Sequence, residues 1–464
     1  MLALPDRVRW CTQGSMSSAF LASTGEIEAR DGALDLSPSS VALAPRRKVR
    51  VLFINDTARN GGPGRSLYYV LRFLDPEVVH RAVVLPRPGV ISELYAESGI
   101  TDDLVFEPDL VENPIEPHHR PMARDDFNAP LPLKGVRALV NVARAGRAMA
   151  RLTSVIQRGA FDLIYCNGTN ADFAGGLLAR TSETPALWHV RYTSLPRIVR
   201  GTHDRLAESK GIARIICVSQ ASASLFPHCQ SKVRVIHNAL DTHEFDMGGI
   251  TPRLRAELGL SSDVVVFGSQ GRILPRKGYI EMIRAAKCAM DQMSADERTK
   301  VQFAVLGDTP EDIRPDHLAE CRRFVANLGM GAYFTFLGFR IDVKPYVADF
   351  DVAVVPSVYP DPLPRAVIEA MALAKPVLAF DVGGVAEMLR SGQTGTLVRG
   401  TPPDVEGLAA QMLRYMRDPN LRARQGRAGR ARVERDFDGA TQARRIQNQI
   451  VEASGLALGS GHIT

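Results

Sequence analysis

The sequence has no long apolar run, no paired cysteine motif and few aromatic residues. Of its 464 residues, 45% are hydrophobic and 6% are aromatic. No apolar stretch approaches the roughly 20 residues that a membrane-spanning helix needs. The six cysteines are scattered without a Cys-x-x-Cys pair, which argues against a zinc site or a disulfide framework and favours reduced thiols in the cytoplasm. They are Cys11, Cys166, Cys217, Cys229, Cys288 and Cys321.

The amino-terminal stretch lacks the features of a signal peptide, because charges and a proline interrupt MLALPDRVRWCTQG. We therefore expect no export. Residues 1–45 also lack hydrophobic periodicity and are rich in Ser, Ala and Pro, so we predict a poorly ordered extension; a native start at Met16 is the alternative. The net charge of +6 slightly favours an anionic partner, and no nucleic-acid partner is expected.

The length of the chain exceeds what one hydrophobic core supports. Strand-like apolar runs alternate with helical patterns, which is typical of mostly parallel sheets. We predict an α/β protein of two Rossmann-like, doubly wound domains facing a central cleft. The expected boundaries are 46–240 for the first domain, 241–262 for the link, 263–435 for the second domain and 436–455 for a helix that packs back on the first.

A glycine-rich loop follows the first predicted strand. The strand is RRKVRVLFIND, the loop is ARNGGPGRS, and the helix SLYYVLRFLD has Leu67, Val70, Leu71 and Leu74 on one face. This order begins an open α/β domain, with the loop at the carboxyl edge of the sheet, where ligands bind. GGPGRS lacks Gly-x-Gly-x-x-Gly and an acidic residue at ribose distance, so we do not expect NAD.

Two histidine features suggest a metal or a catalytic site. His118 and His119 lie in the proline-rich loop 107–132 without a carboxylate or cysteine at ligand spacing, so we expect them to be solvated. His189 lies at the end of the strand pattern PALWHVRY, where α/β active sites form. A buried structural histidine is the alternative.

The segment Lys134–Arg158 predicts an amphipathic helix with a basic face. At about 100° per residue, five arginines fall within an arc of roughly 80°. Such a face can lie on an anionic membrane surface; a solvated face of an ordinary domain helix is the alternative. The five are Arg137, Arg144, Arg147, Arg151 and Arg158.

The stretch Asp361–Glu387, DPLPRAVIEAMALAKPVLAFDVGGVAE, predicts a helix, a buried strand and a glycine turn. Prolines mark the start of the helix, and Lys375-Pro376 ends it. Asp361 and Glu369 lie eight positions apart, and carboxylates accept hydrogen bonds from sugar hydroxyls. The turn at Gly383-Gly384 can bring backbone N–H groups close to a ligand.

A basic pair lies earlier in the same half. Gly271, Arg272 and Lys277 lie at a loop–helix junction, where a guanidinium, an ammonium and helix N–H groups together form an anion site. With the two carboxylates and the glycine turn, this pair predicts a site for a diphosphate and a sugar.

Together these segments resemble the retaining glycosyltransferases of the GT-B fold, glycosyltransferase family four. The similarity covers about residues 48–440 in the family's order. The matching segments are GGPGRSLYYVLRFL, PALWHVRY, IICVSQASASLF, VRVIHNALDTHEF, GRILPRKG, FLGFRIDVKPYVADFDVAVVPS and the stretch from Asp361 to Glu387. The resemblance implies retaining sugar transfer from a nucleotide-sugar donor to a glycan or lipid-linked acceptor, in bacterial-type polysaccharide or glycolipid synthesis. The first domain would hold the acceptor.

The resemblance implies a role for each candidate site residue. Arg272 and Lys277 would neutralise the donor diphosphate. Glu369 would bind the ribose hydroxyls, and Asp361 the hydroxyls of the transferred sugar. His189 would lie near the anomeric carbon or the acceptor. The donor pocket would further include Gly62, Gly271, Gly383, Gly384 and Glu387.

Two departures from the family pattern leave the donor sugar open. Asp361 replaces a glutamate, and Pro-Leu-Pro-Arg replaces Gly-Phe-Gly-Leu, so Pro364 has no N–H to donate.

The Asp349-Phe350-Asp351 triplet matches the metal motif of the other major glycosyltransferase fold. The basic pair already supplies the positive charge that a metal would, and we expect neither a metal nor another cofactor. A GT-B sugar-nucleotide epimerase and a catalytically silent nucleotide-binding partner in a glycan-assembly complex are the alternatives.

Overall fold

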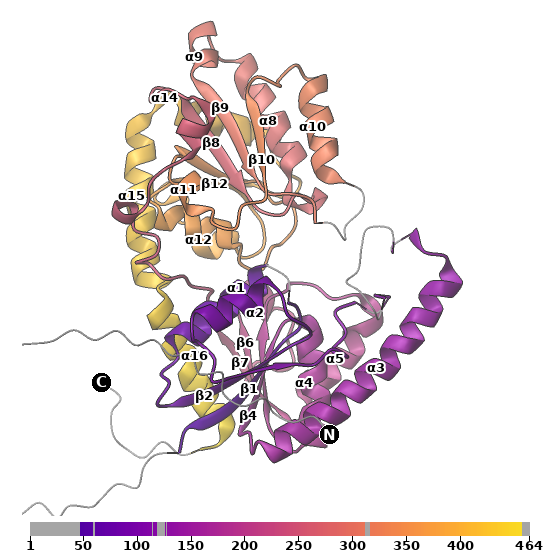
Figure 1. The fold of residues 1–464 in the computed structure, drawn as a ribbon. Helices are drawn as coiled ribbons and strands as arrows, with labels where there is room; N and C mark the ends of the chain where they lie inside the picture. Colours follow the sequence, from indigo (N-terminus) through magenta and orange to yellow (C-terminus); the bar gives the residue numbers. More distant parts are fainter. Residues whose placement is uncertain are drawn as a thin grey trace, which may run out of the picture. The chain divides into compact units, whose positions relative to one another are not determined.

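The computed structural model describes residues 47–58, 61–113, 115–117, 126, 128–310 and 316–456, and Figure 1 shows their fold. The described residues belong to one compact unit that begins at Arg47. The predicted extension at 1–45, Met16 within it, and His118 and His119 lie outside the described residues.

Seven parallel strands form the first sheet, in the order β3-β2-β1-β4-β5-β6-β7. Its central strands are apolar along nearly their whole length and buried, as expected where helices cover both faces of a parallel sheet. The order reverses between β1 and β4, so polar residues that follow these two strands flank the switch point where ligands bind in such sheets. The strands are β1 (Val49–Asn55), β2 (Val79–Leu85), β3 (Asp103–Phe106), β4 (Leu163–Asn167), β5 (Ala186–Val190), β6 (Ile212–Cys217) and β7 (Val233–Val235).

The first helix begins at Gly62, so part of the predicted glycine loop is the first helical turn. Pro63 fits this turn, because proline has no N–H to leave unbonded there. Leu67, Leu71 and the other predicted apolar positions are buried, as expected. The helices of this half are α1 (Gly62–Phe73), α2 (Val90–Glu97), α3 (Leu131–Arg158), α4 (Thr169–Thr181), α5 (Arg197–Glu208) and α6 (Gln220–Ala223).

The second sheet has six parallel strands in the order β10-β9-β8-β11-β12-β13, which again reverses once, between β8 and β11. Two parallel sheets with helices confirm the predicted fold class. The strands are β8 (Val265–Gln270), β9 (Val301–Leu306), β10 (Phe334–Gly338), β11 (Val352–Val355), β12 (Val377–Asp381) and β13 (Gly395–Arg399). The helices of this half are η3 (Pro275–Lys277), α8 (Tyr279–Asp291), α9 (Ala295–Thr299), α10 (His317–Asn327), α11 (Lys344–Val347), α12 (Arg365–Ala372), α13 (Val385–Met388), α14 (Val405–Arg417) and α15 (Pro419–Asp436).

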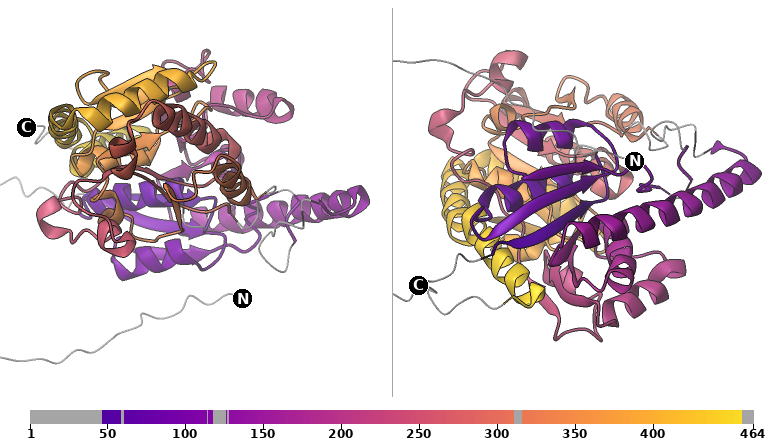
Figure 2. Two further views of the ribbon diagram at one scale, coloured as in Figure 1. Left: turned by 90° about the horizontal axis from the view of Figure 1, so that it is seen from above. Right: turned by 60° about the horizontal axis from the view of Figure 1, so that its bottom comes forward.

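Helix α16 (Gly439–Ser454) packs on α1 and on strands β4, β5 and β6 of the first sheet (Figure 2). Ile446 and Ile450 are buried in this contact. At Gly439 a Cβ atom would lie 2.4 Å from the ring of Phe73, so only glycine allows this close approach of α16 to α1. Between the sheets, the segment 241–262 contains the short helices η2 (Met247–Gly249) and α7 (Leu254–Leu258).

The five described cysteines have free thiols, and all but Cys288 are buried. In the part of the chain that the structure describes, no helix combines the length and the apolarity that crossing a membrane requires.

Candidate functional site

A polar cluster lies at the carboxyl edge of the first sheet, beside its switch point. Asn55 ends β1 and Asn167 ends β4, and Asn167 Nδ2 donates to Asn55 Oδ1 at 2.5 Å and to the carbonyl of Pro63 at 3.2 Å. Arg191, which follows β5, donates through Nε to Asn167 Oδ1 at 2.6 Å. The start of α1 is therefore tied to the ends of the central strands.

His189 is 2% exposed and contacts two side chains through one ring nitrogen. Tyr165 Oη contacts Nδ1, and Arg191 Nη2 lies 3.2 Å from the same atom. A guanidinium only donates hydrogen bonds, so Nδ1 must accept and Nε2 must carry the proton. Burial, with the nearby charge of Arg191, lowers the pKa of His189 well below its usual value, so the ring is neutral.

Nε2 of His189 is buried and has no hydrogen-bond partner among the described residues. A neutral imidazole with its proton on Nε2 can donate there but cannot accept. The ring lines a small cavity of about 10 Å³ together with Arg191, Asn238 and Tyr69. His189 is thus prepared as a hydrogen-bond donor, and this arrangement does not suit a general base at Nε2.

Gly62 is the first residue of α1, and a Cβ built on it would meet no atom of the described residues within 4 Å. Packing within the chain therefore does not require glycine at this position. Its predicted approach to a diphosphate stays a prediction.

Lys277 of the basic pair meets the first carboxylate at the carboxyl edge of the second sheet. Lys277 Nζ forms an ion pair with Asp361 Oδ2. The following residue, Gly278, has φ +71°, and a Cβ there would lie 1.8 Å from the carbonyl oxygen of Pro356. Glycine thus lets the Lys277 turn press against the segment after β11, which leads to Asp361. Gly271 directly follows β8 with φ +144°, and the exposed Arg272 comes next.

Glu369 is held by two side chains that the sequence patterns did not single out. Arg365 Nε lies 3.1 Å from Oε1, and Gln270 Nε2 donates to Oε2 at 2.9 Å. Arg365 also donates to the carbonyl of Ala239 at 3.2 Å, and its guanidinium lies 4.9 Å from the centroid of the Tyr69 ring. Each carboxylate oxygen of Glu369 keeps a lone pair for a further hydrogen bond.

The glycine turn packs against the segment that carries Asp361. Gly384 N donates to the carbonyl of Asp361 at 2.9 Å. A Cβ at Gly383 would lie 2.4 Å from that same oxygen, and one at Gly384 would lie 1.9 Å from the carbonyl oxygen of Pro362. Both glycines are therefore required to bring the two ends of the Asp361–Glu387 stretch together.

Glu387 makes its hydrogen bonds to protein groups. Its carboxylate accepts from the backbone N–H groups of Gln220 at 2.8 Å and Ala221 at 3.1 Å, and it lies 3.2 Å from His237 Nε2. Burial alone would raise the pKa of this carboxyl, but these partners outweigh it and lower the pKa. Its role in shaping a donor pocket stays a prediction.

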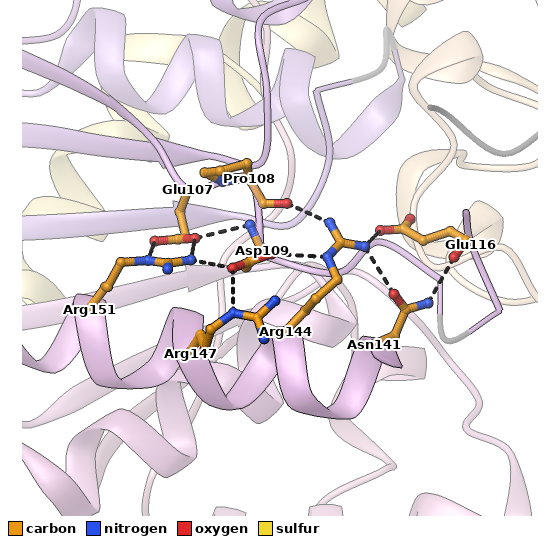
Figure 3. Close-up of polar contacts among 8 residues, drawn as sticks. All are labelled: Glu107, Pro108, Asp109, Glu116, Asn141, Arg144, Arg147 and Arg151. Carbon is orange, nitrogen blue, oxygen red and sulfur yellow. Dashed lines mark hydrogen bonds and ion pairs between the residues drawn. The ribbon is translucent and has the colours of Figure 1, made fainter. Parts of the chain in front are cut away.

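The prediction of a free basic face on α3 is wrong. Most of the arginines of α3 pair with acidic side chains of the same domain (Figure 3). Arg144 Nε lies 3.0 Å from Asp109, and Arg151 Nη2 lies 2.6 Å from Glu107. Arg147 reaches Asp109 at 3.2 Å. Burial would raise the pKa of Asp109, but hydrogen bonds from the three arginines lower it to about 2.

Two further arginines complete the predicted basic face. Arg137 Nη1 lies 3.0 Å from Asp126, whereas Arg158 donates to the carbonyl of Ser154 in its own helix at 3.3 Å. The pairs made by Arg137, Arg144 and Arg151 bind α3 to its own domain, so these three do not form a free cationic surface.

The carboxylates of the Asp349-Phe350-Asp351 triplet hold local structure. Asp351 Oδ2 accepts from the backbone of Val266 at 2.8 Å and from Arg255 Nη2 at 2.6 Å. Asp349 Oδ2 accepts from the backbone N–H of Arg255 at 2.9 Å. Together these bonds fix α7 to the start of β8.

Arg191, Tyr165 and Arg365 contact the candidate site residues His189 and Glu369, and the sequence patterns did not identify them. Signals for two of them were present in the sequence. Arg365 precedes Glu369 by four positions on one helix, the spacing of a helical ion pair. Arg191 comes directly after the strand that carries His189, at the edge where α/β sites form. The contact of Tyr165 with His189 depends on strand order and has no local signal.

Two family models match the chain, and together they cover more than half of it. A model described as Glycosyl transferases group 1 matches residues 251–432, and one described as Glycosyltransferase Family 4 matches residues 108–244. The first contains every candidate residue from Gly271 to Glu387, and the second contains His189.

Individual relatives are similar over part of their length. The chain is 33% identical over 218 residues to alpha-maltose-1-phosphate synthase of Mycobacterium tuberculosis, covering 45% of this chain and 54% of that protein. It is 29% identical over 299 residues to D-inositol 3-phosphate glycosyltransferase of Streptomyces avermitilis, covering 60% and 62%. The chain thus spans between half and two thirds of the length of these relatives.

Solved structures share the fold. HepE of Anabaena in complex with UDP and glucose superposes with a TM-score of 0.69 at 23% identity, covering 87% of this chain and 100% of that one. A glycosyltransferase from Rickettsia africae superposes with a TM-score of 0.70 at 16% identity, covering 88% and 99%. At these identities the likeness concerns the arrangement of the two sheets and their helices.

Proposed function

Because the chain belongs to glycosyltransferase family 4, we propose that it transfers a sugar from a nucleotide-diphosphate sugar to a glycan or lipid-linked acceptor, with retention of anomeric configuration. The observation that carries the proposal is the ion pair of Lys277 with Asp361 beside the held carboxylate of Glu369. A cation for phosphate and two carboxylates for hydroxyls lie at one edge of the second sheet, where α/β domains bind ligands.

In the proposed mechanism, the protein stabilises the charge that develops on the leaving diphosphate. Arg272 and Lys277 provide fixed positive charge there, so no metal is needed for this purpose. Arg365 and Gln270 orient Glu369 for the ribose hydroxyls, and Asp361 holds hydroxyls of the transferred sugar.

Some group must accept the proton that the acceptor hydroxyl loses. Nε2 of His189 already carries a hydrogen, so it donates to a sugar oxygen and does not remove the proton. The leaving phosphate takes the proton as the acceptor attacks from the same face of the sugar. Glu369 forms no covalent intermediate in this scheme, which therefore differs from that of retaining glycosidases.

The donor and the acceptor are proposed only as classes. One relative is named for synthesis of maltose-1-phosphate and another for glycosylation of inositol 3-phosphate, and HepE was crystallised with UDP and glucose. UDP-sugars are therefore the first donors to test. We place the reaction in the cytoplasm, in bacterial-type polysaccharide or glycolipid synthesis, at the inner face of the membrane if the acceptor is lipid-linked.

The experiment is a thermal-shift screen of the purified protein against UDP-, GDP-, ADP- and dTDP-sugars. A ligand at 100 times its dissociation constant adds roughly 2.7 kcal/mol to the free energy of unfolding, which such a screen detects. The nucleotide sugar that stabilises the protein is then offered with candidate acceptors, and the products are analysed.

Three outcomes separate the alternatives. A glycosylated product whose anomeric carbon has the same configuration as in the donor supports the proposal. A product with the opposite anomeric configuration contradicts retention. Conversion of the donor to an isomer without acceptor identifies an epimerase. Binding without hydrolysis or transfer identifies a catalytically silent partner, and no stabilisation by any nucleotide sugar would reject donor binding itself.

A further inference from the structure

The first half of α3 exposes a run of large apolar side chains. Leu131 is 80% exposed, Leu139 74% and Val142 72%. Monomeric soluble proteins rarely expose contiguous apolar surface of this kind without a partner. The exposed apolar residues of this segment are Leu131, Leu133, Val136, Leu139, Val140 and Val142. In Figures 1 and 2 this half of α3 extends beyond the strands of the first sheet.

The side of this segment that faces the protein is polar, which reverses the usual pattern of a surface helix. Asn141 and Arg144 are buried there (Figure 3). Asn141 Nδ2 donates to the carbonyl of Glu116 at 2.9 Å, and Arg144 Nη2 donates to the carbonyl of Pro108 at 2.6 Å. At 100° per residue, Leu139 and Val142 point away from these two.

The second half of α3 has the ordinary orientation. Ala148, Leu152 and Ile156 face the protein and are buried. The reversal is therefore confined to the segment from Leu131 to about Arg147, roughly 25 Å of helix at 1.5 Å per residue. In this segment the buried polar side chains form hydrogen bonds with the domain, and the apolar side chains face solvent.

The charged residues that α3 itself contributes are all basic. The sequence contains no Asp or Glu between Asp126 and Asp162. Lys134 comes seven positions before Asn141 and lies on the side that faces the protein. Arg147, whose side chain is 57% exposed and contacts Asp109, lies at the end of the apolar face. A second copy of the chain on a two-fold axis would bring the same face and the same cations together, which charge repulsion disfavours. A lipid bilayer with anionic headgroups complements both the apolar face and the basic residues.

We propose that the segment Leu131–Arg147 of α3 binds the surface of a bilayer containing anionic lipid. Its apolar face enters the boundary between headgroups and acyl chains, and the exposed part of Arg147 lies beside lipid phosphates. The surface is the side of the helix opposite the buried Asn141 and Arg144. The proposal does not depend on which sugar is transferred.

The test is flotation of the full-length protein with vesicles of phosphatidylcholine and 30% phosphatidylglycerol. The double variant Leu139→Glu, Val142→Glu is expected to bind these vesicles at least tenfold more weakly than the parent. The matched control is Leu177→Glu, Ile198→Glu, which makes the same charge change at exposed apolar residues of α4 and α5 and should bind as the parent does. Both changes lie at exposed positions, and unchanged melting temperatures verify folding.

Specific outcomes overturn the proposal. Equal vesicle binding by the parent and by the α3 double variant would show that this face does not contact the bilayer. Absence of vesicle binding by the parent would show that lipid is not the partner. Loss of self-association by the α3 double variant in light scattering assigns the face to a second copy instead. If the protein binds vesicles but transfers no sugar, the membrane contact of α3 is supported and only the proposed function is rejected.

Discussion

At the scale of single residues, the tautomer of His189 follows from one contact. Arg191 can only donate to Nδ1, so the proton of the neutral ring is on Nε2. We expect ¹⁵N NMR of histidine-labelled protein to give one ring with a protonated Nε2 and an accepting Nδ1. This ring should keep that state at pH 5.5, where an ordinary histidine is mostly protonated.

The lowered pKa of His189 also predicts the direction of a stability change with pH. The unfolded chain binds a proton near pH 6.5 and the folded chain does not, so this residue costs stability as pH falls below that value. His189→Gln should reduce the loss of urea-unfolding free energy between pH 7.5 and 5.5. A loss as large as in the parent would contradict a buried neutral ring.

Lys277 and Arg272 carry the electrostatic part of the proposed mechanism. Lys277→Ala or Arg272→Ala should each lower turnover by roughly 10² to 10³, the usual cost of removing one group that stabilises transition-state charge. Lys287→Ala, which removes a lysine paired with Asp291 on the surface of α8, is the control and should change turnover little. Near-normal turnover of Lys277→Ala would reject the phosphate assignment.

The sequence predicts the kinds of side chains at the site better than their partners. Spacing and resemblance predict Asp361, Glu369, Arg272 and Lys277 as site residues, because the spacing of a motif can be read from a linear chain. The pairing of Lys277 with Asp361 and of Gln270 with Glu369 was not predicted. Such contacts depend on how three strands are ordered in a sheet, and no local pattern encodes that order.

At the scale of elements, α3 and the segment before it form one ion-paired unit. The Arg144 side chain is 8% exposed and contacts both Asp109 and Glu116. Arg144→Ala should lower the free energy of unfolding by about 3–5 kcal/mol, because it leaves the buried carboxylate of Glu116 without this ion-pair partner. Urea unfolding measures the difference.

Arg147→Ala provides the matched comparison on the same helix. Arg147 contacts the same Asp109 but is largely exposed, so its loss should cost less than about 1 kcal/mol. Similar costs for the two variants would mean that burial does not distinguish these pairs.

The periodicity of α3 predicted a helix correctly but misidentified which face meets the protein. A helical wheel gives the angle between faces and not their orientation. The usual rule turns the apolar face inward, and here Glu107, Asp109 and Glu116 instead draw the basic face inward. Those carboxylates lie in a segment whose pattern gave only a loop, so the orientation could not follow from the sequence of α3.

At the scale of the whole molecule, α16 completes the core of the first sheet. Ile450 is fully buried where α16 meets that sheet. Ile450→Ala should therefore destabilise the first half by about 2–5 kcal/mol. Trp188, buried on β5, reports on this half in a Trp10→Phe background, because the chain has two tryptophans.

Asn448→Ala changes an exposed residue of the same helix and serves as the control. It should leave the fluorescence transition of Trp188 unchanged in urea. If Ile450→Ala also leaves that transition in place, the contact of α16 contributes nothing to the first sheet.

The return of α16 to α1 has a consequence for synthesis. About 370 residues separate the end of α1 from the start of α16. At 5 to 20 residues per second, a ribosome needs roughly 20 to 75 seconds to add them. During that time the apolar surface of α1 that α16 later covers is exposed on the nascent chain, beside a finished second sheet. A newly made molecule therefore depends on protection from aggregation at this surface until the helix emerges.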